Sequence, residues 1–556
     1  MSITDIGNLF TFCGGLGMFL YGMRRMSEGI QKSAGSKMRQ LMGILTNNRL
    51  VAVLVGAVIT AILQSSGATT VMVVGFVNAG IMTLTQAVGI IMGANIGICI
   101  TAWIVSLGQL GDSFKAMSPD LYAPLLIGIG SFLLMYSKKQ IKQMSGEIIV
   151  GLGLLFLGLS FMKNSARPYI DLPIFIKAFE AFGSLPILGI LAGAIATAIM
   201  QSSSAFIGIL QTIAVAGGAV TSSSAVFISM GSNIGSCFTT IISSIGASKN
   251  AKRVAAMHLI FNMVSAVIFG AVFFIYFQFN QKMAVSTIDS VGISLFYTMF
   301  NITCTVLLFP FANFFVKLSA SLLPDEQQKK AQLDVETEAY RHLDKRMLET
   351  PTFAVESALK EVVHMGQVTL ENTKLAIEAL KDKNEEKILE VYKNEKTINN
   401  LENILTEYLG KINNLSLTEQ QHLIINNLFY TISDIERIGD HTENIAEQAE
   451  YMIKNNISFS STGKEDILVI AQKAIYAFSN SIECRNTNSK EALRKVIHLE
   501  DEVDMLEEEL RDKHIARLSN CQCNSSSGVV FLDILSNLER IADHAYNIAG
   551  YVKDEM

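Results

Sequence analysis

Two clusters of uncharged polar residues interrupt long apolar stretches in the first half of this 556-residue chain. Serine hydroxyls and glutamine amides donate hydrogen bonds and also offer neutral oxygens, so they can bind a small anion or an alkali cation. No pairing of a nucleophile with a base is recognisable, and we therefore expect a protein that is not an enzyme. The clusters are Gln64, Ser65 and Ser66 within residues 50–80, and Gln201, Ser202, Ser203 and Ser204 within residues 186–218.

The lengths of these two stretches predict how they lie in a membrane. Each polar cluster divides its stretch into two arms of about 14 residues, which is roughly 21 Å of helix. A bilayer crossing needs about 30 Å, so the two arms are too short to cross twice. We expect two re-entrant hairpins, each with a polar tip near the middle of the membrane, because irregular backbone is tolerated there only around a binding cavity.

At each tip the outgoing helix would begin with free backbone N–H groups and the positive end of its dipole. Such a helix end binds anions. Lysine and arginine are absent from residues 50–113 and 178–248. We therefore predict that backbone N–H groups and the side chains of the two clusters hold an oxyanion, such as phosphate, without a fixed positive charge.

Acidic residues are equally scarce around the tips, and this predicts the coupling ion. Residues 50–113 and 178–248 contain only Asp112 and Glu180, whereas proton-coupled carriers place titratable groups inside the membrane. Neutral oxygens suit Na⁺. For these polar residues the alternative is helix packing and capping. The expected sodium ligands are Asn95, Thr101, Asn233 and Thr239.

Composition and charge divide the chain into two chemically different halves. Hydrophobic residues make up 50% of the sequence and charged residues 17%, against about 25% in soluble domains. Residues 1–317 carry a net charge of +10, and residues 318–556 carry −16. This pattern excludes a single soluble enzyme, and the lack of a dense basic face excludes nucleic acid as a partner.

Seven further apolar runs are long enough for membrane helices. If both hairpins return to their own side, the inner loops, which include residues 24–49, carry 12 lysines and arginines, and the outer loops carry 5. By the positive-inside rule we expect a multi-pass protein of the inner or plasma membrane, surrounded by lipid, with its N-terminus outside and its acidic half in the cytoplasm. The runs are 6–26, 86–108, 121–137, 146–162, 224–245, 254–279 and 290–317.

The first half repeats itself at a spacing of about 137 residues. Three crossings separate the two copies, so their orientations would be opposite. Inverted repeats with broken helices at matching positions are the layout of secondary transporters, which bind substrate between the repeats. The matching blocks begin at Gly15 and Gly151, at Gly56 and Gly193, and at Gly93 and Gly231.

The acidic half is predicted to form long amphipathic helices that repeat at about 104 residues, as two three-helix units. In each copy two carboxylates one turn apart, with acids from a neighbouring helix, make an oxygen-rich site for a divalent cation. The alternative is a solvated face paired with Arg437 and Arg540. The expected metal ligands are Glu436, Asp440, Glu539 and Asp543, and the expected helices are 352–382, 386–411, 417–453, 463–486, 489–518 and 526–553.

Both halves resemble known families. The paired Gln-Ser-Ser clusters, with the Asn-Ile-Gly blocks around Asn95 and Asn233, resemble the type II sodium-dependent phosphate cotransporters over about residues 5–315. This implies Na⁺-coupled transport of inorganic phosphate with both tips lining the site. The duplicated Glu-Arg-Ile-x-Asp-His motif resembles the PhoU family over about residues 350–553. That implies a regulatory domain with Mg²⁺, Mn²⁺ or iron at its E-x-x-x-D motifs.

These observations predict an all-α, polytopic membrane protein with inverted repeats and two re-entrant hairpins, followed by a cytoplasmic PhoU-like pair of three-helix bundles. The expected parts are a transmembrane domain (1–318, with repeats at about 6–108 and 146–245), a linker (319–350) and the PhoU-like domain (351–556). We expect phosphate transport with Na⁺ by alternating access. The alternatives are a phosphate sensor without transport and a carrier of another oxyanion. The direction of flux and the oligomeric state, a homo-oligomer included, stay open.

Overall fold

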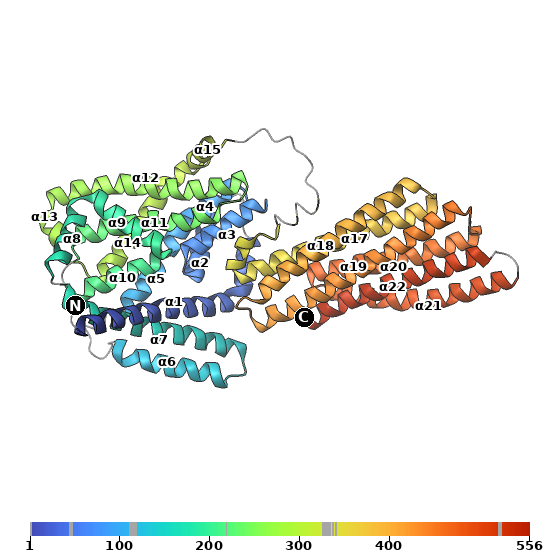
Figure 1. The fold of residues 1–556 in the computed structure, drawn as a ribbon, viewed down its shortest axis with the longest axis horizontal. Helices are drawn as coiled ribbons and strands as arrows, with labels where there is room; N and C mark the ends of the chain where they lie inside the picture. The colour runs from blue at the N-terminus through green and yellow to red at the C-terminus, as the bar shows by residue number, and fades with distance from the viewer. Residues whose placement is uncertain are drawn as a thin grey trace. The chain divides into compact units, whose positions relative to one another are not determined.

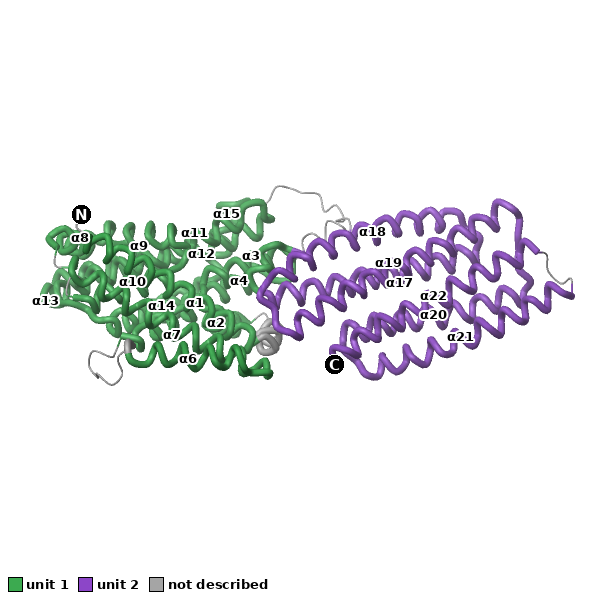
Figure 2. The backbone as a smooth tube through the Cα atoms, turned by 60° about the horizontal axis from the view of Figure 1, so that its bottom comes forward, with its two compact units in different colours: residues 1–331, 344–350 green, residues 332–343, 351–556 purple. Residues whose placement is uncertain are grey.

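The computed structural model describes residues 3–43, 48–109, 119–170, 172–217, 220–324, 335, 339, 342–520 and 525–556. The chain divides into two compact units, residues 1–331 with 344–350 and residues 332–343 with 351–556 (Figure 2). The predicted linker is therefore shared between the units. Helices dominate both units (Figure 1), and the predicted all-α class is confirmed.

Six helices of the first unit, within the described residues, are long and apolar enough to cross a membrane. The seventh predicted crossing is the shorter helix α6. Pro310 interrupts the last crossing, which is split into two helices by a 3-10 turn. The helices are α1 (Ile3–Gly43), α4 (Leu84–Gly97) continued by α5 (Cys99–Leu107), α6 (Pro119–Tyr136), α7 (Gln140–Ala166), α11 (Ser222–Ser243), α12 (Lys249–Phe279), and α14 (Ser290–Leu308) with α15 (Ala312–Leu322).

Helix α1 is much longer than the predicted crossing 6–26. The helix continues to residue 43, so most of the segment predicted as an inner loop, residues 24–49, is helical. Arg24 and Arg25 pair with Glu28, one turn later, at 3.0 and 3.2 Å, and each such pair stabilises a helix by roughly 0.2–0.5 kcal/mol. Charge ends the apolar run here, but it does not end the helix.

The first helices of the two repeats, α1 and α7, pack antiparallel through glycines. A Cβ atom on Gly22 would lie 2.6 Å from the carbonyl oxygen of Gly151, and a Cβ atom on Gly151 would lie 2.6 Å from the carbonyl oxygen of Gly22. Gly15 and Gly158 face each other in the same reciprocal way. In each pair, the glycine of one repeat contacts the carbonyl oxygen of the matching glycine in the other repeat. Such reciprocal contacts indicate that a two-fold axis relates the two helices, as expected for inverted repeats.

The first polar cluster joins α2 (Arg49–Leu63) to α3 (Ser66–Asn78). Thr60 on α2 donates to Thr69 on α3 at 2.8 Å, so the arms lie side by side. Helix α2 begins beside the first turns of α4, because a Cβ atom on Gly89 would lie 3.1 Å from the carbonyl oxygen of Arg49. Helix α3 ends only a short turn before α4 begins. Both ends of this segment therefore lie at the same end of α4, as predicted for a hairpin.

The second polar cluster joins α9 (Pro186–Met200) to α10 (Ser203–Ala216) in the same way. A Cβ atom on Gly189 would lie 2.8 Å from the Cβ of Phe227 in the second turn of α11, and α10 ends shortly before α11 begins. Short elements complete the unit: η3 (Arg167–Tyr169), α8 (Pro173–Ser184), α13 (Gln281–Val285), η4 (Phe309–Phe311) and η5 (Lys345–Glu349). Helix α8 meets α9 at a bend of 113°.

The second unit has the six predicted helices, with ends within a few residues of the predicted positions. Polar caps fix several of their starts. Thr418, for example, forms a capping box with Gln421, in which each side-chain oxygen accepts a hydrogen bond from the other residue's backbone N–H. Helices α17, α18 and α19 pack together, as do α20, α21 and α22, which gives two three-helix groups. The helices are α17 (Pro351–Asp382), α18 (Glu385–Asn413), α19 (Glu419–Lys454), α20 (Ser461–Thr487), α21 (Lys490–Ser519) and α22 (Ser525–Glu555).

Candidate functional site

The two hairpin tips have the same backbone geometry. Gln64 and Gln201 adopt the left-handed conformation, with φ of 52° and 54°. That conformation costs a residue with a side chain on the order of 1 kcal/mol and persists only where the surroundings hold it. Ser65 and Ser202 then cap the outgoing helices, accepting hydrogen bonds from the backbone N–H groups of Ala68 and Ala205 at 3.1 and 3.2 Å.

These caps define what the tips offer to a ligand. Each capping serine uses an oxygen lone pair on the helix, and its O–H group can still donate. In the second tip the hydroxyl of Ser202 lies 3.2 Å from that of Ser204. The N–H groups of the first helical residues have no partner inside the helix and carry the positive end of its dipole. Each tip is therefore rich in donors and suits an anion.

The tips differ in exposure. Gln64 is buried with 4% of its surface exposed, whereas Gln201, its counterpart, is exposed. The serines that follow, Ser66, Ser203 and Ser204, are buried in both hairpins. The two tips therefore differ in the exposure of the glutamine and agree in the burial of the serines that follow it.

Helix α11 of the second repeat packs against the first hairpin. A Cβ atom on Gly67, just past the first tip, would lie 3.7 Å from the methyl group of Thr239. One residue on, the hydroxyl of Thr240 lies 2.6 Å from that of Thr70 on α3. The predicted sodium residue Thr239 therefore lies beside the first tip, on the helix that follows the second one.

Close glycine contacts set the register between each incoming arm and the helix after the hairpin. A Cβ atom on Gly93 would lie 1.9 Å from the carbonyl oxygen of Val53, and one on Gly97 would lie 2.8 Å from the Cβ of Thr60. The helices α2 and α4 therefore run parallel in four-residue steps. Thr101 lies one turn beyond Gly97, at the start of α5. Gly231 and Gly235 make the matching contacts with α9, to Ile190 and Thr197.

Two buried oxygens near the first tip have no hydrogen-bond partner among the described residues. They are the Oε1 of Gln64 and the Oγ1 of Thr101. Buried polar atoms normally find a partner, and an unpaired one in a binding region is a candidate ligand atom. Neutral oxygens of this kind fit the sodium role predicted for Thr101.

The predicted sodium residues Asn95 and Asn233 are both buried and paired with asparagines that the sequence analysis did not single out. The Nδ2 of Asn95 donates to the Oδ1 of Asn262 on α12 at 3.1 Å, and that of Asn233 donates to the Oδ1 of Asn301 on α14 at 2.7 Å. A repeated Phe-Asn pair, Phe261-Asn262 and Phe300-Asn301, is the signal that could have revealed them.

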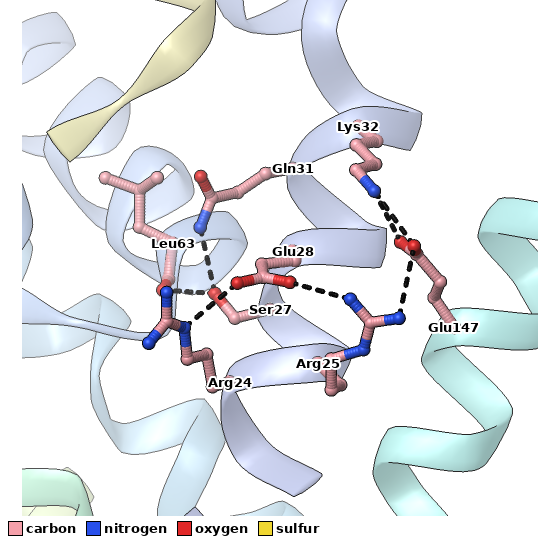
Figure 3. A network of polar contacts seen from close by, with 8 residues as sticks. All are labelled: Arg24, Arg25, Ser27, Glu28, Gln31, Lys32, Leu63 and Glu147. Atoms are coloured by element: carbon pink, nitrogen blue, oxygen red, sulfur yellow. Dashed lines mark hydrogen bonds and ion pairs between the residues drawn. The ribbon is translucent and has the colours of Figure 1, made fainter. Parts of the chain in front are cut away.

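A charged network on α1 lies next to the first hairpin (Figure 3). Ser27 donates to the carbonyl oxygen of Leu63, the residue before the tip, at 2.7 Å. One turn away on α1, Lys32 pairs with Glu147 of α7 at 2.9 Å, and Arg25 reaches the same carboxylate at 3.7 Å. The basic side chains of this network, Arg24, Arg25 and Lys32, are thus paired with carboxylates.

In the second unit the first predicted metal cluster contains a buried carboxylate without a partner. Glu395 of α18 is 2% exposed, and neither of its carboxylate oxygens has a hydrogen bond among the described residues. Burial, with the charges of Glu443, Asp440 and Glu436, raises the pKa of Glu395 to about 8. A Cβ atom on Gly439 would lie 2.7 Å from this carboxylate, so glycine leaves room for it. Acids that repel one another around an unpartnered carboxylate fit a cation.

The second predicted cluster is assembled differently. Ligand atoms of Glu500, Asp504 and Asp543 lie within 4.8 Å of one another, with the first and last half-buried and Asp504 exposed. Burial and the neighbouring acids raise the pKa of Glu500 and of Asp504. Arg540 reaches Glu539 and Asp543 at 3.6 and 3.7 Å. Arginine pairing, the alternative reading, is therefore present here beside the acidic cluster.

Comparison with known proteins identifies two families. The Na⁺/Pi-cotransporter family matches residues 18–164 and 174–308, and the PhoU domain matches residues 362–449 and 467–552. The first match covers about half of the chain. The resemblance of each half to its family is confirmed.

Three relatives and one solved structure illustrate the range of similarity. The "Putative inorganic phosphate export protein YjbB" of Salmonella typhimurium is 23% identical over 97% of this chain and 96% of its own. The "Uncharacterized protein YqeW" of Bacillus subtilis is 28% identical over 57% and 98%. The human "Sodium-dependent phosphate transport protein 2B" is 36% identical over 19% and 16%. The regulatory protein PhoU from Streptococcus pneumoniae is 19% identical and aligns with 36% of this chain and 94% of its own, with a TM-score of 0.33.

Family and helices agree on the class of protein. The first unit has several apolar helices of membrane-spanning length. The matched family is the Na⁺/Pi-cotransporter family, and two of the three relatives carry names that refer to phosphate transport or export. The chain is therefore a multi-pass membrane protein that belongs to the Na⁺/Pi-cotransporter family and carries a PhoU domain after its membrane unit.

Proposed function

We propose that this protein carries inorganic phosphate across the membrane together with Na⁺, by alternating access between the two repeats. The observation that carries the proposal is the pair of hairpin tips, which share a left-handed glutamine and a capping serine. Inverted repeats of this kind bind substrate where they meet. In this proposal Gln64, Ser65 and Ser66 bind the phosphate from one side, and Gln201, Ser202, Ser203 and Ser204 bind it from the other.

Alternating access gains support from the unequal exposure of the tips. In an inverted-repeat carrier the two repeats exchange conformations, so that each state is the mirror of the other. Gln64 is buried and Gln201 is exposed, as expected for one of the two states. In the other state Gln201 would be buried and Gln64 exposed.

The proposed sodium ligands are the side-chain oxygens of Asn95, Thr101, Asn233 and Thr239. All four lie on the helices that follow the hairpins, and Thr239 lies beside the first tip. The human relative is named as sodium-dependent, which supports the choice of ion. The N-terminus is proposed to face outward and the PhoU domain to lie in the cytoplasm.

The PhoU domain is proposed to regulate this flux and to hold a divalent metal or iron. Glu395 joins Glu436 and Asp440 in the first metal site, and Glu539 and Asp543 contribute to the second. A bound cation would neutralise the repelling carboxylates and join α18 to α19. The chain just before this domain is fixed to the membrane unit, because Asp344 accepts from Asn78 at the end of α3 at 2.7 Å.

Radiolabelled phosphate flux in proteoliposomes tests the transport proposal. Flux is measured with a Na⁺ gradient in either direction and with choline in place of Na⁺, so that uptake and export are both detected. We expect flux that follows the Na⁺ gradient and falls at least tenfold in Gln64→Ala with Gln201→Ala. Flux that is unchanged in this double variant would remove the tips from the site, and binding without flux would indicate a sensor.

Metal analysis tests the second proposal. Residues 332–343 and 351–556 form a compact unit with its own core, so residues 332–556 can be expressed alone. We expect bound divalent metal or iron, with a loss of about half on Asp440→Ala, since the second cluster remains. Purified wild-type protein without metal, or Asp440→Ala with the full amount, would make the acidic face a solvated surface.

A further inference from the structure

The two asparagine pairs of the membrane unit are related as the repeats are. Asn262 donates from its Nδ2 to the carbonyl oxygen of His258 at 3.1 Å and to the Sγ of Cys237 at 3.3 Å. Asn301 donates to the carbonyl oxygen of Tyr297 at 2.8 Å and to the Sγ of Cys99 at 3.5 Å. Each asparagine therefore binds the Asn-Ile-Gly block of one repeat and the cysteine of the other.

These bonds determine which atom of each predicted sodium ligand is left for an ion. The amide of Asn262 is oriented by a main-chain carbonyl, which can only accept, so its Oδ1 must face Asn95. The Nδ2 of Asn95 is consequently used, and its Oδ1 points elsewhere. The same reasoning fixes Asn233 through Asn301. Asn262 and Asn301 are thus positioning residues that present a carbonyl oxygen for a cation.

The two proposed sodium sites differ in the hydrogen bonding of the Oδ1 atoms of Asn95 and Asn233. The hydroxyl of Tyr297 donates to the Oδ1 of Asn233 at 2.5 Å. At the matching position of α12 stands His258, which instead lies 3.1 Å from the hydroxyl of Thr240. Within the part of the chain that the structure describes, no donor reaches the Oδ1 of Asn95. Among the described residues, the Oδ1 of Asn95 therefore accepts no hydrogen bond, whereas the Oδ1 of Asn233 accepts one from a phenol, which takes one of its two lone pairs.

Tyr297 also contacts the second hairpin. It is 1% exposed and packs in one apolar cluster with Ile207 and Leu210 of α10. Its hydroxyl neighbours Ser203, the first helical residue after the second tip. The same hydroxyl thus lies between a predicted sodium ligand and a predicted phosphate ligand.

We propose that the Tyr297 hydroxyl competes with Na⁺ for the Oδ1 of Asn233, so that the two related sodium sites differ in affinity and the one at Asn95 fills first. This inference rests on the proposed sodium coupling. Sodium binds most strongly at the Asn233 oxygen when Tyr297 turns its hydrogen away. Because that hydroxyl neighbours Ser203, this step links the second ion to the phosphate tip. Tyr297 therefore sets the sodium dependence of transport without being required to bind either solute.

The test is the sodium dependence of phosphate flux in proteoliposomes of the full-length protein, with choline keeping the ionic strength constant. Tyr297→Phe removes the competing hydrogen bond, and we expect its half-saturating Na⁺ concentration to fall about fivefold, which corresponds to about 1 kcal/mol. The KM for phosphate should change less than twofold. Tyr276→Phe is the matched control and should behave as wild type. Among the described residues, the one hydrogen bond of its hydroxyl is to the sulfur of Met283, at 3.4 Å.

The variant Asn262→Leu should change the half-saturating Na⁺ concentration in the opposite direction. It removes the acceptor that orients Asn95, and its half-saturating Na⁺ concentration should rise. A variant that merely loosens the fold would not raise sodium affinity, so the fall expected for Tyr297→Phe separates competition from structural damage. If Tyr297→Phe does not reconstitute, Tyr297→Met also lacks the hydroxyl. The Na⁺-dependent rise in melting temperature in detergent then reports binding without transport.

The outcomes distinguish this inference from the proposed function. Wild-type flux that ignores Na⁺ would refute both the sodium coupling and the competition. Wild-type flux that requires Na⁺, with an unchanged or raised half-saturating concentration in Tyr297→Phe, would refute the competition alone.

Discussion

Replacing Gly93 with alanine should disrupt transport by displacing the first hairpin. A Cβ atom at this position would lie 1.9 Å from the carbonyl oxygen of Val53 and 2.8 Å from the backbone nitrogen of Ala57. An ordinary contact needs about 3.4 Å, so α2 and α4 would have to separate by about 1.5 Å. The obstacle is main chain, which cannot change rotamer. Overpacking of this kind typically costs about 1–3 kcal/mol.

The displacement reaches the site because α2 ends at the tip. A misplacement of about 1 Å in a binding constellation can cost on the order of 100-fold in rate. We therefore expect Gly93→Ala to lower Na⁺-driven phosphate flux by one to two orders of magnitude, while the protein still inserts and elutes as a folded species. Flux in proteoliposomes and size-exclusion chromatography are the two measurements.

Two alanine variants calibrate this experiment. Gly231→Ala, in the second repeat, would place its Cβ atom 2.0 Å from the carbonyl oxygen of Ile190 and should have a similar effect. Gly128→Ala on α6 has no atom within 4 Å and should leave flux unchanged. If Gly93→Ala transports like Gly128→Ala, the register between hairpin and crossing helix does not control the site.

Two further predictions concern the free energy of unfolding of residues 332–556, a fragment that includes His342, measured in urea. Burial favours a raised pKa for Glu361, but hydrogen bonds from His342 and His364, both at 2.9 Å, outweigh it and lower the pKa from 4.5 to about 2. The ionised Glu361 contributes about 3 kcal/mol to the free energy of unfolding. This contribution is complete above pH 4.5 and is lost as the pH falls toward 2, so Glu361→Gln should be less stable at neutral pH and should lack this loss in acid. A pH profile of stability that is the same in Glu361→Gln and wild type would contradict the assignment. Arg485 and Glu555 form an ion pair in which both side chains are 2% exposed. Glu555→Ala should therefore lower the free energy of unfolding by about 3–5 kcal/mol, because it leaves a buried charge unpaired, and Arg485→Met combined with Glu555→Leu should recover part of that loss. A cost below about 1 kcal/mol for Glu555→Ala alone would show that the pair is unimportant for stability.

The sequence predicted the elements that depend on length and periodicity. Arms of about 14 residues around a polar cluster specified two hairpins, and amphipathic spacing specified the six helices of the second unit. The predicted first crossing ends at residue 26, whereas α1 continues to Gly43. The prediction ended the crossing at Arg24 and Arg25, but both arginines pair with Glu28 on the same helix. Local charge marks the limit of an apolar run, whereas pairing decides whether the helix continues.

The parts of the site that the sequence did not reveal depend on contacts between distant segments. Asn262 and Asn301 are single polar residues in apolar helices, and only packing shows which asparagine each one meets. The same holds for Tyr297, whose hydroxyl becomes important through its contact with Asn233. The sequence indicated acids on a neighbouring helix, but not that Glu395 is buried without a hydrogen-bond partner. Its carboxylate occupies the space that Gly439 leaves by having no side chain, and this contact could not be predicted from residue spacing.

The reciprocal packing of α1 and α7 has a genetic consequence. Gly22 and Gly151 each face the other's carbonyl oxygen, so a larger residue at one meets peptide backbone and no side chain of its partner. Trimming the opposite residue cannot relieve the clash, because glycine is already the smallest. Suppressor selections against a bulky replacement at either position should consequently return true revertants and no paired second-site changes.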